Sequence, residues 1–290
     1  MDDSTPDTIS RRRNTVPGVR FKDVRGQETE MRTVTLPDHA EVSALGQGTW
    51  RMGEDPRRRE QEIAALHAGV DLGMTLIDTA EMYGDGATED LVGEALAGVR
   101  DQVFLISKVY PQNAGRGRLE KACEASLKRL KTDRLDLYLL HWRGSVPLAE
   151  TIEGMNALVQ AGKIRRWGVS NFDHADMEQL FRAGGQACAT DQILYNVTER
   201  GAEFDLFPLL NRNLIPVMAY SPMVKGFPSV SVANQAAASD LSSQHELAPT
   251  SDAYMVCAKR MNGALVVDRE SGRAVYTTSV TWADEECSQR

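Results

Sequence analysis

The sequence predicts an α/β fold, a (β/α)8 TIM barrel preceded by a short β-hairpin, and three observations support it. The length of 290 residues suits one such barrel. Short β-branched or aliphatic runs alternate with longer runs of helical period, and eight such runs follow one another. Alternation of this kind indicates a parallel sheet, because each parallel connection needs a crossover, and eight units close into a barrel.

The predicted strands are short runs rich in β-branched and aliphatic residues. They cover residues 44–48, 75–79, 103–109, 135–141, 166–171, 191–195, 216–220 and 264–267. Ahead of them, residues 33–36 and 41–44 are separated by a turn-forming segment that contains Pro37 and Asp38. This pattern predicts a hairpin that caps the floor of the barrel.

Helices are predicted between the strands, where apolar residues recur every three or four positions. The pattern is clear over 63–70, 119–130, 155–159 and 205–210, and weaker over 236–244. Gly162 is well placed to end the third of these helices. A last helix is barely visible over 279–290, so we expect the C-terminal helices to be incomplete.

An open, doubly wound sheet is the alternative fold. Such a sheet usually opens with a GxGxxG phosphate loop after its first strand. Here residues 46–51 read GQGTWR, and no acidic residue follows the second strand in the expected role. The barrel is therefore favoured.

Composition narrows the partners and the location. The net charge of −8 argues against nonspecific nucleic-acid binding. No apolar run approaches the ~20 residues of a membrane span, so we expect no membrane partner. Residues 1–30 are polar and lack the apolar core of a secretory signal. We expect a disordered tail over 1–30, a single barrel over 31–290 that diverges from about 223 onward, and a cytoplasmic location. Its oligomeric state is expected to be a monomer or a weak oligomer.

The four cysteines carry no metal-binding or disulfide pattern. Cys123, Cys188, Cys257 and Cys287 lie far apart, without CxxC spacing. Free thiols in a reducing compartment are the simplest interpretation, and we expect no metal site.

Titratable side chains follow three consecutive predicted strands. Asp78 ends the second strand and Tyr83 lies on the loop beyond it; Lys108 ends the third strand, and His141 ends the fourth. The carboxyl ends of barrel strands meet at one face, so these groups are expected to share one mouth. Taken singly, each has a structural interpretation as a turn cap, a surface charge, a core hydrogen bond or a packing ring.

Together these groups suit the reduction of a carbonyl. Hydride addition creates an alkoxide that needs a proton, and a tyrosine with a pKa of about 10 is a poor donor. The ammonium of Lys108 is expected to lower the pKa of Tyr83, and Asp78 to hold Lys108 charged. His141 can hydrogen-bond the carbonyl oxygen.

Two long runs resemble signatures of the aldo/keto reductase family. Residues 76–84 read LIDTAEMYG, and residues 162–172 read GKIRRWGVSNF. The similarity extends from about residue 31 to 222. Within the family, residues 46–50 and 52–55 (GQGTW and MGED) resemble bacterial members that reduce methylglyoxal and related small aldehydes.

The resemblance implies a role for each site residue. Asp78, Tyr83, Lys108 and His141 match the catalytic tetrad, with Tyr83 as the general acid, and Asp78 also contacts the cofactor. The other matched positions are Ser170, Asn171 and Gln192 for the nicotinamide carboxamide, Tyr220 for its ring, Ser221 for the phosphates, and Gly48, Thr49 and Trp50 for cofactor and substrate. Trp142 joins Trp50, Tyr83 and His141 in the substrate wall. Tyr220 and Trp142 can also be read as plain core packing.

The pattern departs from the family after Pro222. Family members carry a Pro-Lys-Ser/Thr element with an arginine six residues past the lysine, which binds the 2′-phosphate of NADPH. Residues 267–273 here read VDRESGR. Arg269 keeps the charge at the lysine position, but Asp268 and Glu270 would repel phosphate. NADPH is the expected cofactor, with NADH as the alternative because this element is degraded.

Three functions are compatible with these observations. The leading one is NADPH-dependent reduction of small aldehydes and ketones. The second is a catalytically impaired cofactor-sensing or interaction protein, which the broken 2′-phosphate element favours. If residues 223–290 have diverged, the cofactor is expected to bind weakly or NADH to be preferred; if that segment is decayed or mistranslated, a poor enzyme or none is expected. The third, a hydrolase with paired carboxylates, lacks a second acid at the strand ends beyond Asp78.

Overall fold

A computed structural model of the chain describes residues 20–22, 28–196, 198–222 and 278–283. Within them, eight strands form a closed barrel in the order β10-β11-β12-β5-β6-β7-β8-β9. The predicted α/β barrel is therefore confirmed.

Seven of the barrel strands lie within predicted runs. They are β5 (Leu45–Gly48), β6 (Leu76–Asp78), β7 (Phe104–Val109), β8 (Leu137–Leu140), β9 (Trp167–Ser170), β10 (Asp191–Leu194) and β11 (Val217–Tyr220). Consecutive members pair in parallel from β5 to β11. Their carboxyl ends therefore meet at one face of the barrel.

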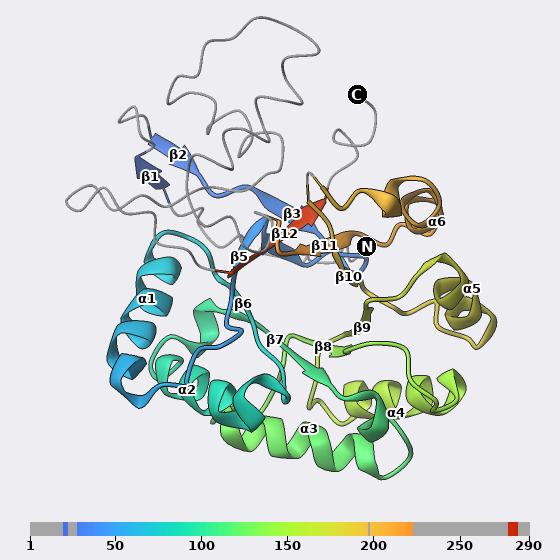
Figure 1. Cartoon of the computed structure of the whole chain (residues 1–290), viewed down its shortest axis with the longest axis horizontal. Coiled ribbons are helices and arrows are strands. Elements are labelled where there is room, and N and C mark those ends of the chain that lie inside the picture. The colour runs from blue at the N-terminus through green and yellow to red at the C-terminus, as the bar shows by residue number, and fades with distance from the viewer. Residues whose placement is uncertain (1–19, 23–27, 197, 223–277, 284–290) are drawn as a thin grey trace, which may run out of the picture.

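In the part of the chain that the structure describes, six α-helices follow strands β5 to β10 and pack on the outside of the barrel (Figure 1). They are α1 (Arg59–Asp71), α2 (Ala87–Ala95), α3 (Arg118–Arg129), α4 (Leu148–Gln160), α5 (His174–Arg182) and α6 (Leu206–Arg212). Short 3-10 turns lie at η1 (Pro56–Arg58), η2 (Tyr83–Gly86), η3 (Arg100–Gln102), η4 (Pro111–Asn113) and η5 (Gly201–Glu203). Four of the helices confirm the predicted ones, and the segment 236–244 lies outside the described residues.

Helices α2 and α5 were not predicted from the sequence. Helix α5 carries a recognisable start, because the side chain of Asp173 accepts a hydrogen bond from the backbone N–H of Asp176. Its buried side chains, Met177 and Leu180, have helical spacing. The signal was present but short, as expected for a helix of 9 residues.

The eighth barrel position differs from the prediction. It is occupied by β12 (Thr278–Ala283), which pairs antiparallel with both β11 and β5. The predicted strand over 264–267 lies outside the described residues. The expectation of a faint helix over 279–290 is wrong for 279–283, because this run (SVTWA) contains β-branched and aromatic residues that favour a strand.

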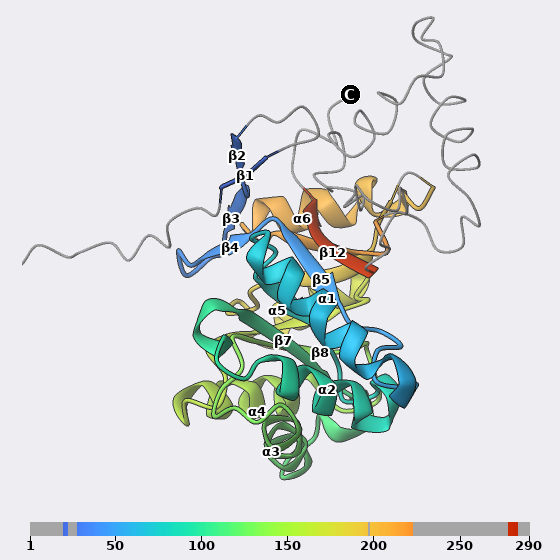
Figure 2. The ribbon, with the colours of Figure 1, turned by 90° about the vertical axis from the view of Figure 1, so that its left-hand side faces the viewer.

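The predicted hairpin is present as β3 (Thr33–Thr35) and β4 (Glu41–Ser43), which pair antiparallel. Its buried residues Leu36 and Val42 join an apolar cluster with Leu76, Ile106 and Met218 from the barrel strands. This cluster fills the barrel interior at the amino ends of the strands, so the hairpin does cap the floor. Figure 2 shows β1 to β4 together on one side of the molecule.

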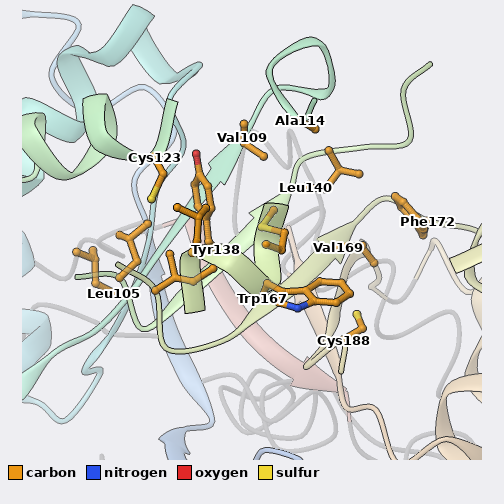
Figure 3. Packing of buried hydrophobic residues seen from close by; sticks show 14 of the residues in the cluster. Leu105, Val109, Ala114, Cys123, Tyr138, Leu140, Trp167, Val169, Phe172 and Cys188 are labelled. Carbon is orange, nitrogen blue, oxygen red and sulfur yellow. The ribbon is translucent and has the colours of Figure 1, made fainter. Parts of the chain in front are cut away.

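A second, larger core lies between the strands and the helices. Residues that alternate with the interior positions, such as Leu105, Tyr138 and Trp167, point outward into it (Figure 3). Cys123 and Cys188 are buried in the same cluster as free thiols, and burial raises the pKa of each to about 12. The expectation of free cysteines is confirmed for these two; Cys257 and Cys287 lie outside the described residues.

The N-terminal segment contains one described feature. Strands β1 (Arg20–Lys22) and β2 (Glu28–Glu30) pair antiparallel. The disordered tail over 1–30 stays a prediction for the remainder. Among the helices that the structure describes, none is long and apolar enough to cross a bilayer.

Because β12 closes the barrel through backbone pairing, the stability of the protein should depend on the backbone N–H groups of this strand. Val280 pairs with Gly46 on one side and Tyr220 on the other. The substitution Val280→Pro removes a ladder donor inside the barrel and should lower the free energy of unfolding by at least about 1 kcal/mol. Thermal unfolding should show a Tm lower by roughly 2–4 °C or more. Val280→Ala, which keeps the N–H, is the control. Equal Tm values for the two variants would contradict a paired β12.

Candidate active site

A cavity of about 300 Å3 opens at the carboxyl ends of the barrel strands. Its volume lies at the lower end of the roughly 300–1,000 Å3 found for small-molecule sites. The side chains and backbone that line it are Gly48, Thr49, Trp50, Asp78, Met82, Tyr83, His141, Trp142, Ser170, Asn171, Gln192, Tyr220 and Ser221. Twelve of these residues were singled out from the sequence, and the barrel brings them to one mouth. Arg269 lies outside the described residues.

A buried ammonium lies beside the cavity. Lys108 Nζ contacts Asp78 Oδ2 at 2.7 Å, the carbonyl oxygen of Thr79 at 3.0 Å and the hydroxyl of Tyr83 at 3.1 Å. Lys108 is 1% exposed and Asp78 is 3% exposed. An ammonium is stable at such a depth only when it is paired, and here all three of its hydrogens have an oxygen partner.

The electrostatics of this group differ in one respect from the expectation. Burial pushes the pKa of Lys108 down, but Asp78 and Tyr83 outweigh burial, and the pKa lies above its ordinary value. For Tyr83, burial raises the pKa more than Lys108 lowers it. The predicted net lowering is therefore wrong, although Lys108 acts in the predicted direction. Tyr83 consequently keeps its proton at neutral pH, as a proton donor must.

His141 is neutral in this site. Burial, with help from the charge of Lys108, lowers the pKa of His141 to about 3. Its Nδ1 is buried, and no group among the described residues forms a hydrogen bond with it. A buried N–H without an acceptor is costlier than a buried lone pair, so the tautomer with the proton on Nε2 is favoured. The ring therefore offers one N–H donor and no charge.

A network of amide side chains lines another part of the cavity. Asn171 Nδ2 donates to the carbonyl of His141 at 3.0 Å and to Ser170 Oγ at 3.1 Å, while its Oδ1 accepts from the hydroxyl of Tyr220 at 2.8 Å. Gln192 Nε2 donates to Asp78 Oδ1 at 2.9 Å. The network thus links the wall to the buried ion pair.

Two strand ends turn sharply into the cavity. Asn171, after β9, has φ of 57°, and Ser221, after β11, has φ of 51°. Asparagine adopts this left-handed conformation readily, whereas serine does so rarely. Residues held in such conformations concentrate at functional sites, which agrees with the position of both on the cavity.

Aromatic rings form the outer wall. Trp50 is 42% exposed and Trp142 is 36% exposed, and both line the cavity. The ring of Trp142 packs on His141 with centroids 4.9 Å apart and edge-on against Tyr110 at 5.8 Å. Met82 also lines the cavity and was not singled out from the sequence, although it directly precedes Tyr83.

The donor set suits a nicotinamide. A hydroxyl and two side-chain amides, from Ser170, Asn171 and Gln192, are the groups that a carboxamide pairs with. Tyr220 presents a half-buried ring beside them. Among the described residues, no cluster of His, Cys, Asp or Glu could hold a metal ion. The residues present therefore fit the expected cofactor.

Comparison with known proteins identifies a matching family model and similar sequences. The family model described as "Aldo/keto reductase family" matches residues 44–283. Methylglyoxal reductase YeaE of Escherichia coli is 55% identical over 197 residues, which are 68% of this chain and 69% of that protein. Aldo-keto reductase YhdN of Bacillus subtilis is 40% identical over 200 residues, covering 64% of this chain and 60% of that protein.

A solved structure shares the architecture. An aldo-keto reductase of Klebsiella pneumoniae in complex with NADPH superposes with a TM-score of 0.65 and 56% identity. The match covers 67% of this chain and 69% of that one.

The low pKa of His141 predicts a pH dependence of stability. In the unfolded chain this pKa returns to about 6.5, so the unfolded state binds more protons between about pH 3 and 6.5. The free energy of unfolding should therefore fall as the pH drops through that range. Urea unfolding at pH 7.5 and pH 5 should show a smaller loss for His141→Gln than for the parent. Equal losses would show that His141 is not held neutral.

Proposed function

Because the chain belongs to the aldo/keto reductase family, we propose that it reduces small aldehydes and ketones of the methylglyoxal type to alcohols with NADPH. Tyr83 is the general acid in this proposal. The observation that carries it is the placement of Lys108 Nζ, 2.7 Å from Asp78 and 3.1 Å from the hydroxyl of Tyr83, at the edge of one cavity.

The proton step follows from these contacts. Hydride addition at the carbonyl carbon leaves negative charge on the oxygen, and Tyr83 donates its phenolic proton to that oxygen. Lys108 stabilises the phenolate that remains, since an opposite charge within hydrogen-bond distance favours the ionised form. Asp78 keeps Lys108 charged and fixed in place.

His141 positions the carbonyl. As a neutral imidazole it donates one hydrogen bond to the substrate oxygen without a charge that would compete for the proton of Tyr83. Its ring lies edge-on to Tyr83, with centroids 5.9 Å apart. Both rings line the same cavity, so in this proposal the two donors act on the same substrate oxygen.

The cofactor assignment rests on the amide wall. NADPH supplies the hydride when bound, and Ser170, Asn171 and Gln192 would hold its carboxamide, with the ring of Tyr220 beside them. Gly48, Thr49 and Ser221 would contact the remainder. The complex of the Klebsiella relative with NADPH supports this choice.

The substrate class rests on size and similarity. The cavity is small, and Trp50 and Trp142 line it. The similarity to an enzyme named methylglyoxal reductase supports small carbonyl compounds as substrates.

A cofactor-sensing or interaction protein with impaired catalysis is the second candidate. The observation that favours it is the sequence around Arg269, where Asp268 and Glu270 flank the single cation expected at the 2′-phosphate. Such flanking charges weaken phosphate binding. This segment lies outside the described residues.

Removal of the phenol tests catalysis. Tyr83→Phe should lower kcat by roughly 10²–10⁴, the range for loss of a positioned general acid. The measurement is NADPH oxidation at 340 nm with methylglyoxal. Binding of NADPH, followed by tryptophan fluorescence, should be retained. Matching rates for parent and variant would refute the role of Tyr83.

Cofactor preference is tested separately. Titration by tryptophan fluorescence should give a lower Kd for NADPH than for NADH, because the family resemblance puts the positive charge of Arg269 at the position that binds the 2′-phosphate. Arg269→Gln should reduce this preference without changing NADH binding. An equal or lower Kd for NADH in the parent would refute the NADPH assignment.

A further inference from the structure

Glu81 lies two residues before Tyr83, and the reaction described above does not use it. Its Oε1 accepts hydrogen bonds from the backbone N–H of Tyr110 at 2.6 Å and from Asn113 Nδ2 at 3.1 Å. Its own N–H donates to the carbonyl of Lys108 at 3.2 Å. One residue therefore ties the loop that carries Tyr83 to the end of β7 and to the turn η4.

The partners of Glu81 lead to the substrate wall. Tyr110 meets Trp142 edge-on, with centroids 5.8 Å apart and an interplanar angle of 89°. Trp142 packs on His141 at 4.9 Å, and His141 lies edge-on to Tyr83 at 5.9 Å. A closed series of contacts thus runs from Glu81 through the aromatic rings and back to the loop of Tyr83.

The environment of Glu81 indicates more than a surface acid. Burial raises the pKa of Glu81, and the two donors from Tyr110 and Asn113 oppose that rise. Among the described residues, no ion pair joins Glu81 to a lysine or arginine. A half-buried carboxylate without a cation is costly unless donors satisfy it. Here the donors are Tyr110, whose ring contacts Trp142, and Asn113 in the turn that follows it.

We infer that Glu81 is a positioning residue: by anchoring Tyr110, it holds Trp142 in place and so sets the size of carbonyl compound that the cavity accepts. This inference rests on the proposed function. A small aldehyde should bind more tightly when Trp142 is fixed, because it then fills the cavity. A bulky aromatic aldehyde needs more space and should bind more tightly when Trp142 is displaced.

The kinetic test compares two variants of Glu81. Glu81→Ala should raise KM for methylglyoxal roughly five- to twentyfold and change kcat by less than about threefold, because wall contacts are lost in the ground state and the transition state alike. The ratio of kcat/KM for methylglyoxal to that for benzaldehyde should fall. Glu81→Gln keeps an oxygen acceptor and should stay within about threefold of the parent. Glu153→Ala removes an exposed glutamate on α4 and is the matched control.

A double-mutant cycle tests the route through Trp142. In a Trp142→Ala background, Glu81→Ala should change KM by less than about twofold, since the wall that it positions is gone. A full effect in that background would overturn the inference. So would a loss of kcat at unchanged KM, or a Glu81→Gln variant as impaired as Glu81→Ala. If Glu81→Ala does not fold, Asn113→Ala removes one donor and should give the same trend at smaller size.

A test without turnover separates this inference from the proposed function. The difference in acrylamide quenching between the parent and Trp142→Phe isolates the fluorescence of Trp142. Glu81→Ala should increase that quenching, and Glu81→Gln should not. Unchanged quenching in Glu81→Ala would refute the inference even if the parent is an active enzyme. If quenching increases in a protein that does not reduce methylglyoxal, the positioning of Trp142 by Glu81 is supported and only the proposed function is refuted.

Discussion

The ion pair between Lys108 and Asp78 is the interaction on which the site depends. An ammonium with 1% exposure needs a carboxylate, and the barrel supplies it through the register of neighbouring strands. Asp78 pairs with Ile106 on β7, and Lys108 lies two residues further along, on the same interior face. The pair lies where Tyr83 enters from the next loop, so the contact that stabilises Lys108 also places its charge beside a phenol.

The barrel interior is divided into an apolar floor and a polar top. Leu36 and Val42 of the hairpin close the floor together with Leu76, Ile106 and Met218. One step toward the carboxyl ends, Asp78 and Lys108 follow Leu76 and Ile106 on the interior faces of β6 and β7, and Gln192 of β10 donates a hydrogen bond to Asp78. The apolar floor stabilises the barrel and the polar top carries the residues of the site, as is general for parallel barrels. The apolar floor therefore shields the ion pair on the side that faces away from the cavity.

The sequence was sufficient for seven of the eight barrel strands and for twelve of the residues that line the cavity. Apolar runs bounded by polar residues are strong signals, and Asp78, Lys108 and His141 each end such a run. A property that depends on opposing interactions, such as a pKa, could not be predicted from the sequence. The net pKa of Tyr83 reflects burial against the charge of Lys108, and burial cannot be read from a sequence.

Helix α5 was missed because 9 residues give few apolar repeats. The antiparallel β12 was missed because strand direction follows from the closure of the barrel rather than from residues 278–283. The anchoring by Glu81 depends on hydrogen bonds between two loops, and no local pattern records these.

The most direct test of the account is the titration of Tyr83 itself. Ultraviolet absorbance of the phenolate, taken as the difference between the parent and Tyr83→Phe, isolates this one tyrosine. The same difference is then measured in a Lys108→Met background. If Lys108 stabilises the phenolate as its 3.1 Å contact indicates, the titration should move to higher pH when the ammonium is removed. An unchanged titration would mean that the ammonium and the phenol do not interact, and the proton-transfer account would be wrong.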